Sequence, residues 1–225
     1  MLLYYITDRV SLGNDEAQCQ RRLLQKIAEA ARQGVDFIQL REKDLSGKEL
    51  ESLAREAAAV IKTSSQGATT GPRTKFLINS RTDVALATSA DGVHLTSHDI
   101  SPRNVRKIYS RAGLTRAAQS RPPILSIACH SQEEVAVAAQ ERADFALFSP
   151  VFGKQTLGKQ SSPHAPAGLK ALEQACREDI PVIALGGITL ENAPDCARAG
   201  AAGIAAIRLF QENDVGEVVT KLRSL

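Results

Sequence analysis

The sequence has none of the long apolar runs, basic blocks or paired cysteines that identify several large classes of protein. No segment of its 225 residues approaches a membrane-spanning helix, which needs about 18 consecutive apolar residues. The N-terminal residues lack the basic region of a signal peptide, so we expect a cytoplasmic protein with no membrane partner. Lys and Arg form no dense cluster and are not interleaved with aromatic residues, so no nucleic-acid partner is expected.

The four cysteines are scattered along the chain and show no CxxC spacing. Cysteines of this kind usually stay reduced in a cytoplasmic protein, so neither a disulfide framework nor a zinc site is predicted. Cys129, which lies beside a histidine, is expected to be a small buried hydrophobic residue and not a nucleophile. The net charge of +3 is small and fits an anionic small ligand.

Short apolar runs of strand type alternate with longer amphipathic segments from one end of the chain to the other. The predicted strands are Leu2–Ile6, Val35–Leu40, Lys75–Asn79, Gly92–Leu95, Ile124–Ala128, Phe145–Phe148, Pro181–Leu185 and Gly203–Ile207. The predicted helices are Glu16–Gln33, Gly47–Lys62, Gln132–Glu141 and Leu190–Ala199. Continuous apolar runs are typical of strands buried on both faces of a parallel sheet. The pattern therefore predicts an α/β fold, a single-domain (β/α)8 TIM barrel over residues 1–225, with an open doubly wound sheet as the alternative.

A pair of glycines, Gly186 and Gly187, follows the seventh predicted strand. In barrels of this type phosphate commonly binds to the loops after strands 7 and 8, where glycines let backbone N–H groups approach closely. A helix N-terminus adds a partial positive charge. A glycine pair can also be an ordinary turn, but its position after the seventh strand predicts a phosphate-binding site.

Charged residues follow the second predicted strand. Alternation along that strand points Gln39, Arg41 and Lys43 to one side and Glu42 to the other. Two cations that converge at the mouth of a barrel are costly unless an anion binds between them. Arg41 can hold phosphate or carboxylate in a bidentate manner, whereas Lys43 acts as a point charge. The alternative is a solvent-exposed Arg-Glu-Lys loop.

Further polar residues end or follow the third, fourth and fifth predicted strands. Asn79 ends the third strand, and His94 and Asp99 lie at and after the end of the fourth. His130 follows the fifth strand and is a candidate general acid or base, because a histidine side chain titrates near neutral pH. The alternative for His130 is a packed or helix-capping residue.

The two most irregular segments are predicted to be loops. Ser64–Arg73 is rich in Gly, Ser and Thr and is expected to connect a helix to the third strand. Gly153–Pro166 follows the sixth strand, on the side where the loops of a barrel build the active site, and is expected to form a mobile lid.

Taken in order, these motifs resemble those of the thiamine-phosphate synthase and TenI superfamily. The resemblance covers YYITDR at the start, then VDFIQLREKDLS, KFLINSRTDVAL, ADGVHLTSHDISP, CHSQEEVAVA, ADFALFSPVF, IPVIALGGIT and AGAAGIAAI. It implies a barrel that binds thiazole phosphate. The residues that it places near the thiazole phosphate are Gly186, Gly187, Ala205 and Ala206, and those around a pyrimidine pyrophosphate are Arg41, Lys43 and Asn79.

Two branches of this superfamily differ in their chemistry. Synthases join the pyrimidine of a hydroxymethylpyrimidine pyrophosphate to the thiazole nitrogen, release pyrophosphate and need Mg²⁺. TenI-type proteins isomerise a carboxythiazole phosphate tautomer to its aromatic form, which is proton transfer alone and needs no metal.

Several positions depart from the synthase pattern. Ser80 stands where synthases have an aspartate that binds Mg²⁺, and Ala128 stands where they usually have a serine. The segment after the sixth strand only approximates the synthase Thr-x-Thr-Lys, although Lys159 could still hold pyrophosphate. Asp99 matches the other metal-binding carboxylate, and His130 matches the histidine proposed as proton carrier in the tautomerase. These departures favour the tautomerase branch.

The preferred hypothesis is therefore a thiazole tautomerase, an isomerase without a cofactor, in which His130 moves the proton. The alternative is a thiamine-phosphate synthase, a transferase that binds Mg²⁺ with Asp99. A third hypothesis is a non-catalytic binder or regulator, and an unrelated phosphate-binding barrel is disfavoured by the combined motifs. The expected partners are a phosphorylated thiazole and, for a synthase, a pyrimidine pyrophosphate; homo-oligomer formation stays open.

Overall fold

The computed structural model describes residues 1–65, 73–112, 122–153 and 165–225. Its eight strands follow one another in sequence order around a closed barrel, and helices alternate with them along the chain. The predicted α/β class and (β/α)8 TIM barrel are confirmed, and the open-sheet alternative is wrong. The chain divides into two compact units, and the expectation of one domain over residues 1–225 stays a prediction.

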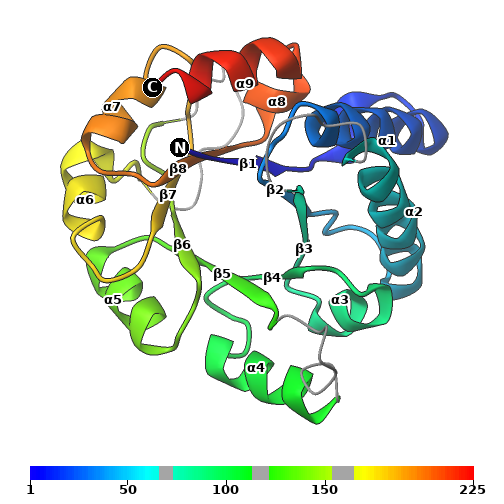
Figure 1. Ribbon diagram of the computed structural model, residues 1–225, viewed down its shortest axis with the longest axis horizontal. Helices are drawn as coiled ribbons and strands as arrows, with labels where there is room; N and C mark the ends of the chain where they lie inside the picture. Colours follow the sequence, from blue (N-terminus) through cyan, green and yellow to red (C-terminus); the bar gives the residue numbers. More distant parts are fainter. Residues whose placement is uncertain (66–72, 113–121, 154–164) are drawn as a thin grey trace. The chain divides into compact units, whose positions relative to one another are not determined.

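The first unit, which we call the β1–β3 unit, consists of Leu2–Gly92 and Ala206–Leu225. Its strands are β1 (Leu2–Ile6), β2 (Phe37–Leu40) and β3 (Lys75–Asn79). Its helices are the short 3-10 helix η1 (Arg9–Leu12), α1 (Glu16–Arg32), α2 (Gly47–Ser65), α3 (Thr82–Thr88), α8 (Arg208–Gln211) and α9 (Val215–Arg223). The strands are parallel, and α1 and α2 lie side by side outside them (Figure 1).

Helix α1 shows how local chemistry sets the limits of these elements. The Asp15 carboxylate accepts the N–H of Gln18 and so satisfies one of the free donors at the start of the helix. At the other end, the N–H of Val35 donates to the carbonyl of Ala30 and continues the helix C-terminus. Strand β2 therefore begins at Phe37, two residues later than predicted.

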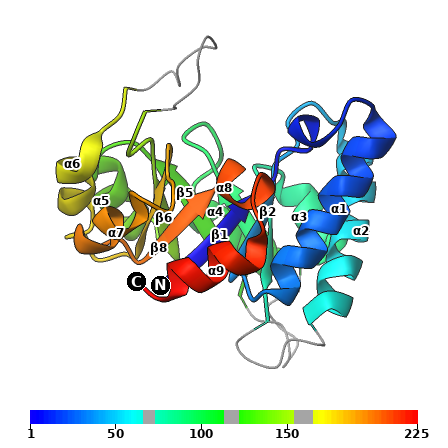
Figure 2. The same ribbon diagram turned by 90° about the horizontal axis from the view of Figure 1, so that it is seen from above.

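The second unit, which we call the β4–β8 unit, consists of Val93–Ala205 together with Met1. Its strands are β4 (Gly92–Leu95), β5 (Ile124–Cys129), β6 (Phe145–Phe148), β7 (Val182–Leu185) and β8 (Gly203–Ala206), of which Gly92 and Ala206 fall in the first unit. Its helices are α4 (Pro102–Arg111), α5 (Gln132–Gln140), α6 (Gly168–Ala175) and α7 (Ala193–Arg198). Helices α5, α6 and α7 are grouped together beside β6 (Figure 2).

Strands β6 and β8 are buried along their whole length, as expected for strands that are covered on both faces. Helix α7 begins at Ala193, three residues later than predicted. The reason is a turn before the helix, in which the N–H of Thr189 donates to the Asn192 side chain at 2.8 Å. No helix among the described residues is long and apolar enough to cross a membrane.

The two predicted loops fall largely outside the described residues. Ser64 and Ser65, the first two residues of the predicted loop Ser64–Arg73, form the end of α2 instead. Of the predicted lid Gly153–Pro166, the structure describes Gly153 and the last two residues, so the lid stays a prediction.

Candidate functional site

Strand β7 is followed directly by the predicted phosphate-binding glycines. Both glycines have a left-handed backbone, with φ of 100° at Gly186 and 62° at Gly187. Leu185 lies beside Ala205 in the β7–β8 register, so the predicted residue Ala205 is next to the start of the glycine turn. Within the described part of the chain, the backbone N–H groups of Gly187 and Ile188 donate no hydrogen bond. Unpaired N–H groups of this kind are the donors that an anion needs.

The glycine pair also packs against the segment that follows β6. A Cβ added to Gly186 would lie 2.6 Å from the Cα of Pro150, and one added to Gly187 would lie 2.6 Å from the carbonyl oxygen of Gly153. The N–H of Phe152 donates to the carbonyl of Gly186 at 3.0 Å. Both positions therefore require glycine for backbone packing, in addition to the predicted contact with phosphate. The fourth predicted residue, Ala206, is buried at the end of β8.

His130 directly follows β5. Its Nδ1 lies 2.5 Å from the carbonyl oxygen of Ser149, and because a carbonyl can only accept, Nδ1 is the donor. A neutral His130 ring consequently has its lone pair on Nε2. The backbone N–H of His130 donates to the Glu134 carboxylate at 2.6 Å, and Ser131 caps helix α5. The backbone of His130 thus belongs to the start of α5, while the ring is oriented by the end of β6.

Cys129 precedes this histidine at the end of β5. Its side chain is buried, and burial, together with the charge of Glu134, raises the pKa of the thiol to about 12. A thiol with this pKa is not ionised at neutral pH and is a poor nucleophile. Cys129 is a buried hydrophobic residue, as expected from the sequence.

Asp99 organises the loop between β4 and α4. Its Oδ2 accepts the N–H of Thr96 at 2.7 Å and the hydroxyl of Thr96 at 2.9 Å. A cavity of about 360 Å³ lies between β5, α5 and the start of α4. Of the predicted site residues that the structure describes, Asp99 alone lines this cavity.

Magnesium prefers oxygen ligands and usually binds through one or two carboxylates together with substrate phosphates. Among the described residues, no three His, Cys, Asp or Glu side chains are grouped to hold a metal ion. Asp99 Oδ1 accepts no hydrogen bond there, so Asp99 fits as one ligand to Mg²⁺ but not as a complete site. Ser80 has a left-handed φ of 59°, and its hydroxyl accepts from Asn79 at 3.1 Å.

A chain of hydrogen bonds brings together two predicted binding residues of the β1–β3 unit. The hydroxyl of Tyr4 donates to Gln39 Oε1 at 2.9 Å, and Gln39 Nε2 donates to Asn79 Oδ1 at 2.8 Å. The Gln39 side chain is buried, and both ends of its amide are engaged. We therefore interpret Gln39 as the residue that orients Asn79.

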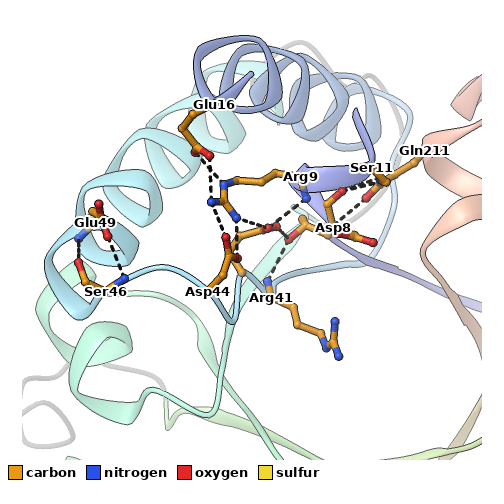
Figure 3. Close-up of polar contacts among 11 residues, drawn as sticks. Asp8, Arg9, Ser11, Glu16, Arg41, Asp44, Ser46, Glu49 and Gln211 are labelled. Atoms are coloured by element: carbon orange, nitrogen blue, oxygen red, sulfur yellow. Dashed lines mark hydrogen bonds and ion pairs between the residues drawn. The ribbon is translucent and has the colours of Figure 1, made fainter. Parts of the chain in front are cut away.

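The charged segment after β2 is built around a residue that precedes it by more than thirty positions. Arg9 is buried and donates bidentate pairs of hydrogen bonds to Glu16 and to Asp44, with N···O distances of 2.7–3.0 Å. Its Nη1 also lies 3.3 Å from Glu42. We call Arg9, Glu16, Glu42, Asp44 and Thr7 the Arg9 cluster. Figure 3 shows Arg9 between Glu16 and Asp44.

Glu42 is buried, so the alternative of a solvent-exposed Arg-Glu-Lys loop is wrong for this residue. Burial raises the pKa of the Glu42 carboxyl, and its hydrogen bonds with Thr7 and Arg9 oppose that effect. The alternation predicted from the sequence agrees with this placement, because the side chain of Arg41 extends away from the cluster (Figure 3).

Arg41 is half-buried and Lys43 is exposed, and neither forms an ion pair with any residue that the structure describes. The positive charge of Arg41, with a smaller effect of burial, lowers the pKa of Lys43. Two cations without a carboxylate partner can together bind a multiply charged anion.

Other residues fall outside this pattern. His94 is buried in β4, with its Nδ1 2.9 Å from the hydroxyl of Ser126 on β5. Lys159 lies outside the described residues. Reasoning from the sequence missed Arg9 and Thr7, which both lie in the YYITDR motif. An arginine three residues after a buried strand was the available signal.

Comparisons with known proteins give matches over most of the chain. The sequence model of one family, described as thiamine monophosphate synthase, matches residues 3–210. The thiamine-phosphate synthase of Chlorobium luteolum is 37% identical over 82% of this chain and 77% of its own. That of Clostridium novyi is 32% identical over 94% of this chain and 91% of its own. Among solved structures, the thiamine phosphate pyrophosphorylase from Pyrococcus furiosus matches with a TM-score of 0.74 and 27% identity, over 99% of this chain and 94% of its own.

Proposed function

Because this chain belongs to the thiamine monophosphate synthase family, an enzyme family of thiamin biosynthesis, we propose that it is a thiamine-phosphate synthase. The observation that carries the proposal is the pair Arg41 and Lys43, which has no carboxylate partner among the described residues. A tautomerase of a thiazole monophosphate needs a single phosphate site. A synthase must also hold a pyrophosphate, and a second cationic site fits that requirement.

In this reaction the thiazole nitrogen attacks the methylene carbon of the pyrimidine substrate. The new C–N bond forms as the C–O bond to pyrophosphate breaks, and pyrophosphate leaves with the electron pair. We assign the glycine turn at Gly186 and Gly187, with Ala205 and Ala206, to the phosphate of the thiazole. Holding that remote phosphate lets binding energy orient the reacting ring.

Arg41 and Lys43 are assigned to the pyrophosphate, whose developing negative charge they would stabilise as the C–O bond breaks. Asn79, oriented by Gln39, is assigned to the pyrimidine substrate, and Lys159 to the pyrophosphate. Asp99 would supply one ligand to Mg²⁺, which neutralises pyrophosphate charge when bound. No proton transfer is required in the coupling itself.

The preference for a tautomerase, drawn from the sequence, is not confirmed, and the names of the relatives favour the synthase. The observation that still supports the tautomerase is the orientation of the His130 ring, whose Nδ1 donates to the carbonyl of Ser149. We keep it as the second candidate.

The deciding experiment supplies purified protein with thiazole phosphate and hydroxymethylpyrimidine pyrophosphate, with Mg²⁺ or with EDTA. We expect thiamin phosphate and pyrophosphate to form in equal amounts with Mg²⁺ and not with EDTA. The tautomerase is tested separately with the carboxythiazole phosphate tautomer and no pyrimidine. Turnover there in EDTA, together with no coupling in the first assay, would replace the synthase by the tautomerase.

Removing the charge of Arg41 should change the KM for one substrate and not for the other. In Arg41→Gln we expect the KM for the pyrimidine pyrophosphate to rise about tenfold or more, since a bidentate charge-assisted contact is lost. The KM for thiazole phosphate should stay within about twofold, because that phosphate is assigned to the glycine turn. Lys48→Gln, which removes an exposed charge from α2, serves as the control. Equal KM values in Arg41→Gln and Lys48→Gln would contradict the role of Arg41.

Introducing a carboxylate at position 80 should lower the Mg²⁺ concentration that the coupling reaction needs. The left-handed φ of Ser80 is tolerated by aspartate, so Ser80→Asp should fold normally. We expect the Mg²⁺ concentration for half-maximal coupling to fall about threefold or more, because a hard cation prefers a charged oxygen ligand. Ser80→Asn, which has the same shape without the charge, is the matched control. A Mg²⁺ requirement that is the same in both variants would show that position 80 does not contact the ion.

A further inference from the structure

Thr7, the residue directly after β1, links two consecutive residues of the charged segment. Its side chain is completely buried. The hydroxyl of Thr7 donates to the Glu42 carboxylate and accepts the backbone N–H of Arg41 at 2.9 Å. The N–H of Thr7 itself donates to the carbonyl of Gln39 at 3.0 Å. One small side chain thus connects the end of β1 to the backbone that carries Arg41.

Arg9 also holds this segment, through the carboxylates of Glu42 and Asp44. Glu42 Oε2 accepts the backbone N–H of Arg9 at 3.0 Å and lies 3.3 Å from its Nη1. Both oxygens of Asp44 accept from the same guanidinium, at 2.7 Å and 2.8 Å. Glu42 and Asp44 flank Lys43 in the sequence. The segment is therefore held at Arg41 through its backbone N–H and at Glu42 and Asp44 through their side-chain carboxylates.

The same contacts keep carboxylates away from the two cations. Glu42 and Asp44 are the carboxylates nearest to Arg41 and Lys43 in sequence, and both are engaged by Arg9. A free Asp44 side chain could rotate toward Lys43 and neutralise it. With the carboxylates bound to Arg9, the two cations are left to an external anion. Figure 3 shows Asp44 turned toward Arg9 and the side chain of Arg41 extending away from it.

We propose that Thr7, Arg9 and Glu42 are positioning residues that hold Arg41 and Lys43 as an uncompensated cation pair for the pyrophosphate group of the substrate. The identity of this anion rests on the proposed function. A site ordered in advance loses little conformational entropy on binding, so its cations bind more tightly than the same side chains on a mobile loop.

The test removes the Thr7 hydroxyl and measures the binding of inorganic pyrophosphate to the whole protein by titration calorimetry at constant Mg²⁺. Thr7→Val has nearly the same shape but can neither accept from Arg41 nor donate to Glu42. We expect its Kd for pyrophosphate to rise about tenfold, because small displacements of a binding group are costly. Thr7→Ser keeps the hydroxyl and should restore the affinity to within about threefold of the unmodified protein.

A double variant distinguishes a role of Thr7 in positioning Arg41 from a general loss of stability. If Thr7 acts through Arg41, adding Thr7→Val to Arg41→Gln should change the pyrophosphate Kd by less than about twofold, although Thr7→Val alone changes it about tenfold. The KM for the pyrimidine pyrophosphate should rise in Thr7→Val, while the KM for thiazole phosphate stays the same. A role confined to stability would not produce this difference between the two substrates.

Thr74→Val is the matched control, because Thr74 is also buried and its hydroxyl donates to the carbonyl of Val35 at 2.8 Å. It should lower the thermal midpoint about as much as Thr7→Val and leave pyrophosphate binding unchanged. Should Thr7→Val fail to fold, Glu42→Gln takes its place, since it keeps an acceptor for Thr7 and removes the charge that Arg9 holds. It should weaken pyrophosphate binding severalfold.

The outcomes distinguish this inference from the proposed function. If Arg41→Gln weakens pyrophosphate binding but Thr7→Val and Glu42→Gln do not, the positioning role is overturned and the assignment of Arg41 stands. If Arg41→Gln binds pyrophosphate as the unmodified protein does, the assignment of the anion is wrong and the positioning role falls with it.

Discussion

Gly187→Ala is expected to raise the KM for thiazole phosphate about tenfold or more and to destabilise the protein. The left-handed φ of 62° costs an alanine about 1–2 kcal/mol relative to glycine. The new methyl group would also lie 2.6 Å from the carbonyl oxygen of Gly153 and 2.8 Å from that of Phe152, so backbone must move. Such a movement shifts the N–H groups that we assign to the phosphate, and binding geometry is sensitive to displacements of this size.

Gly34→Ala is the matched control for this prediction. Gly34 also has a left-handed φ, of 76°, but a methyl group added there would meet no atom within 4 Å. It should therefore show only the conformational cost and no change in KM. Steady-state kinetics and urea unfolding of both variants make the comparison. A Gly187→Ala enzyme with normal KM for thiazole phosphate would mean that this phosphate binds elsewhere.

Arg9→Ala should lower the free energy of unfolding by about 3–5 kcal/mol at pH 7, because it leaves the buried carboxylate of Glu42 without its cation. Arg55→Ala, which breaks the exposed pair with Glu51 on α2, should cost less than about 0.5 kcal/mol. Urea unfolding at constant pH measures both. Equal effects in the two variants would show that the Arg9 cluster contributes little to stability.

The loss of stability in Arg9→Ala should also depend on pH. The direction of that dependence follows from the pKa shifts of two carboxylates, Asp44 and Glu42. Arg9 lowers the pKa of Asp44, so the stability it provides there is present at neutral pH and is lost as the pH falls through that pKa. In the variant, Glu42 is buried without the guanidinium and its pKa rises further, so protonation in acid stabilises the variant. Both changes reduce the difference in stability between the two proteins as the pH falls from neutral into the acid range. A difference that grows in acid would contradict this account.

The strands could be predicted well because apolar runs of this chain end where polar residues begin. Lys75–Asn79 and Phe145–Phe148, for example, have the same limits in the structure as in the sequence analysis. Short helices such as Thr82–Thr88 could not be predicted, since seven residues show too little periodicity to distinguish a helix from a turn.

The two cations of the candidate site could be predicted from the sequence, but the residues that hold them in place could not. Arg41 and Lys43 stand out because they follow a buried strand, and alternation predicts their common direction. The partner of Glu42 could not be found in this way, because Arg9 is 33 residues away and no local rule connects the two positions. The glycine turn shows the same limit. Its position after the seventh strand predicts a role for Gly187, but the contact with Gly153 depends on the tertiary structure and cannot be predicted from local sequence.

In the hydrogen bonds from Tyr4 through Gln39 to Asn79, each residue donates to the next. A phenol has one proton to give, and by giving it to Gln39 Oε1 it decides which end of that amide faces Asn79. The amide of Asn79 is then fixed too, with its oxygen toward Gln39 and its NH₂ group toward Ser80. A tyrosine in the first strand, which the substrate need never touch, thereby determines whether the end of the third strand presents a donor or an acceptor.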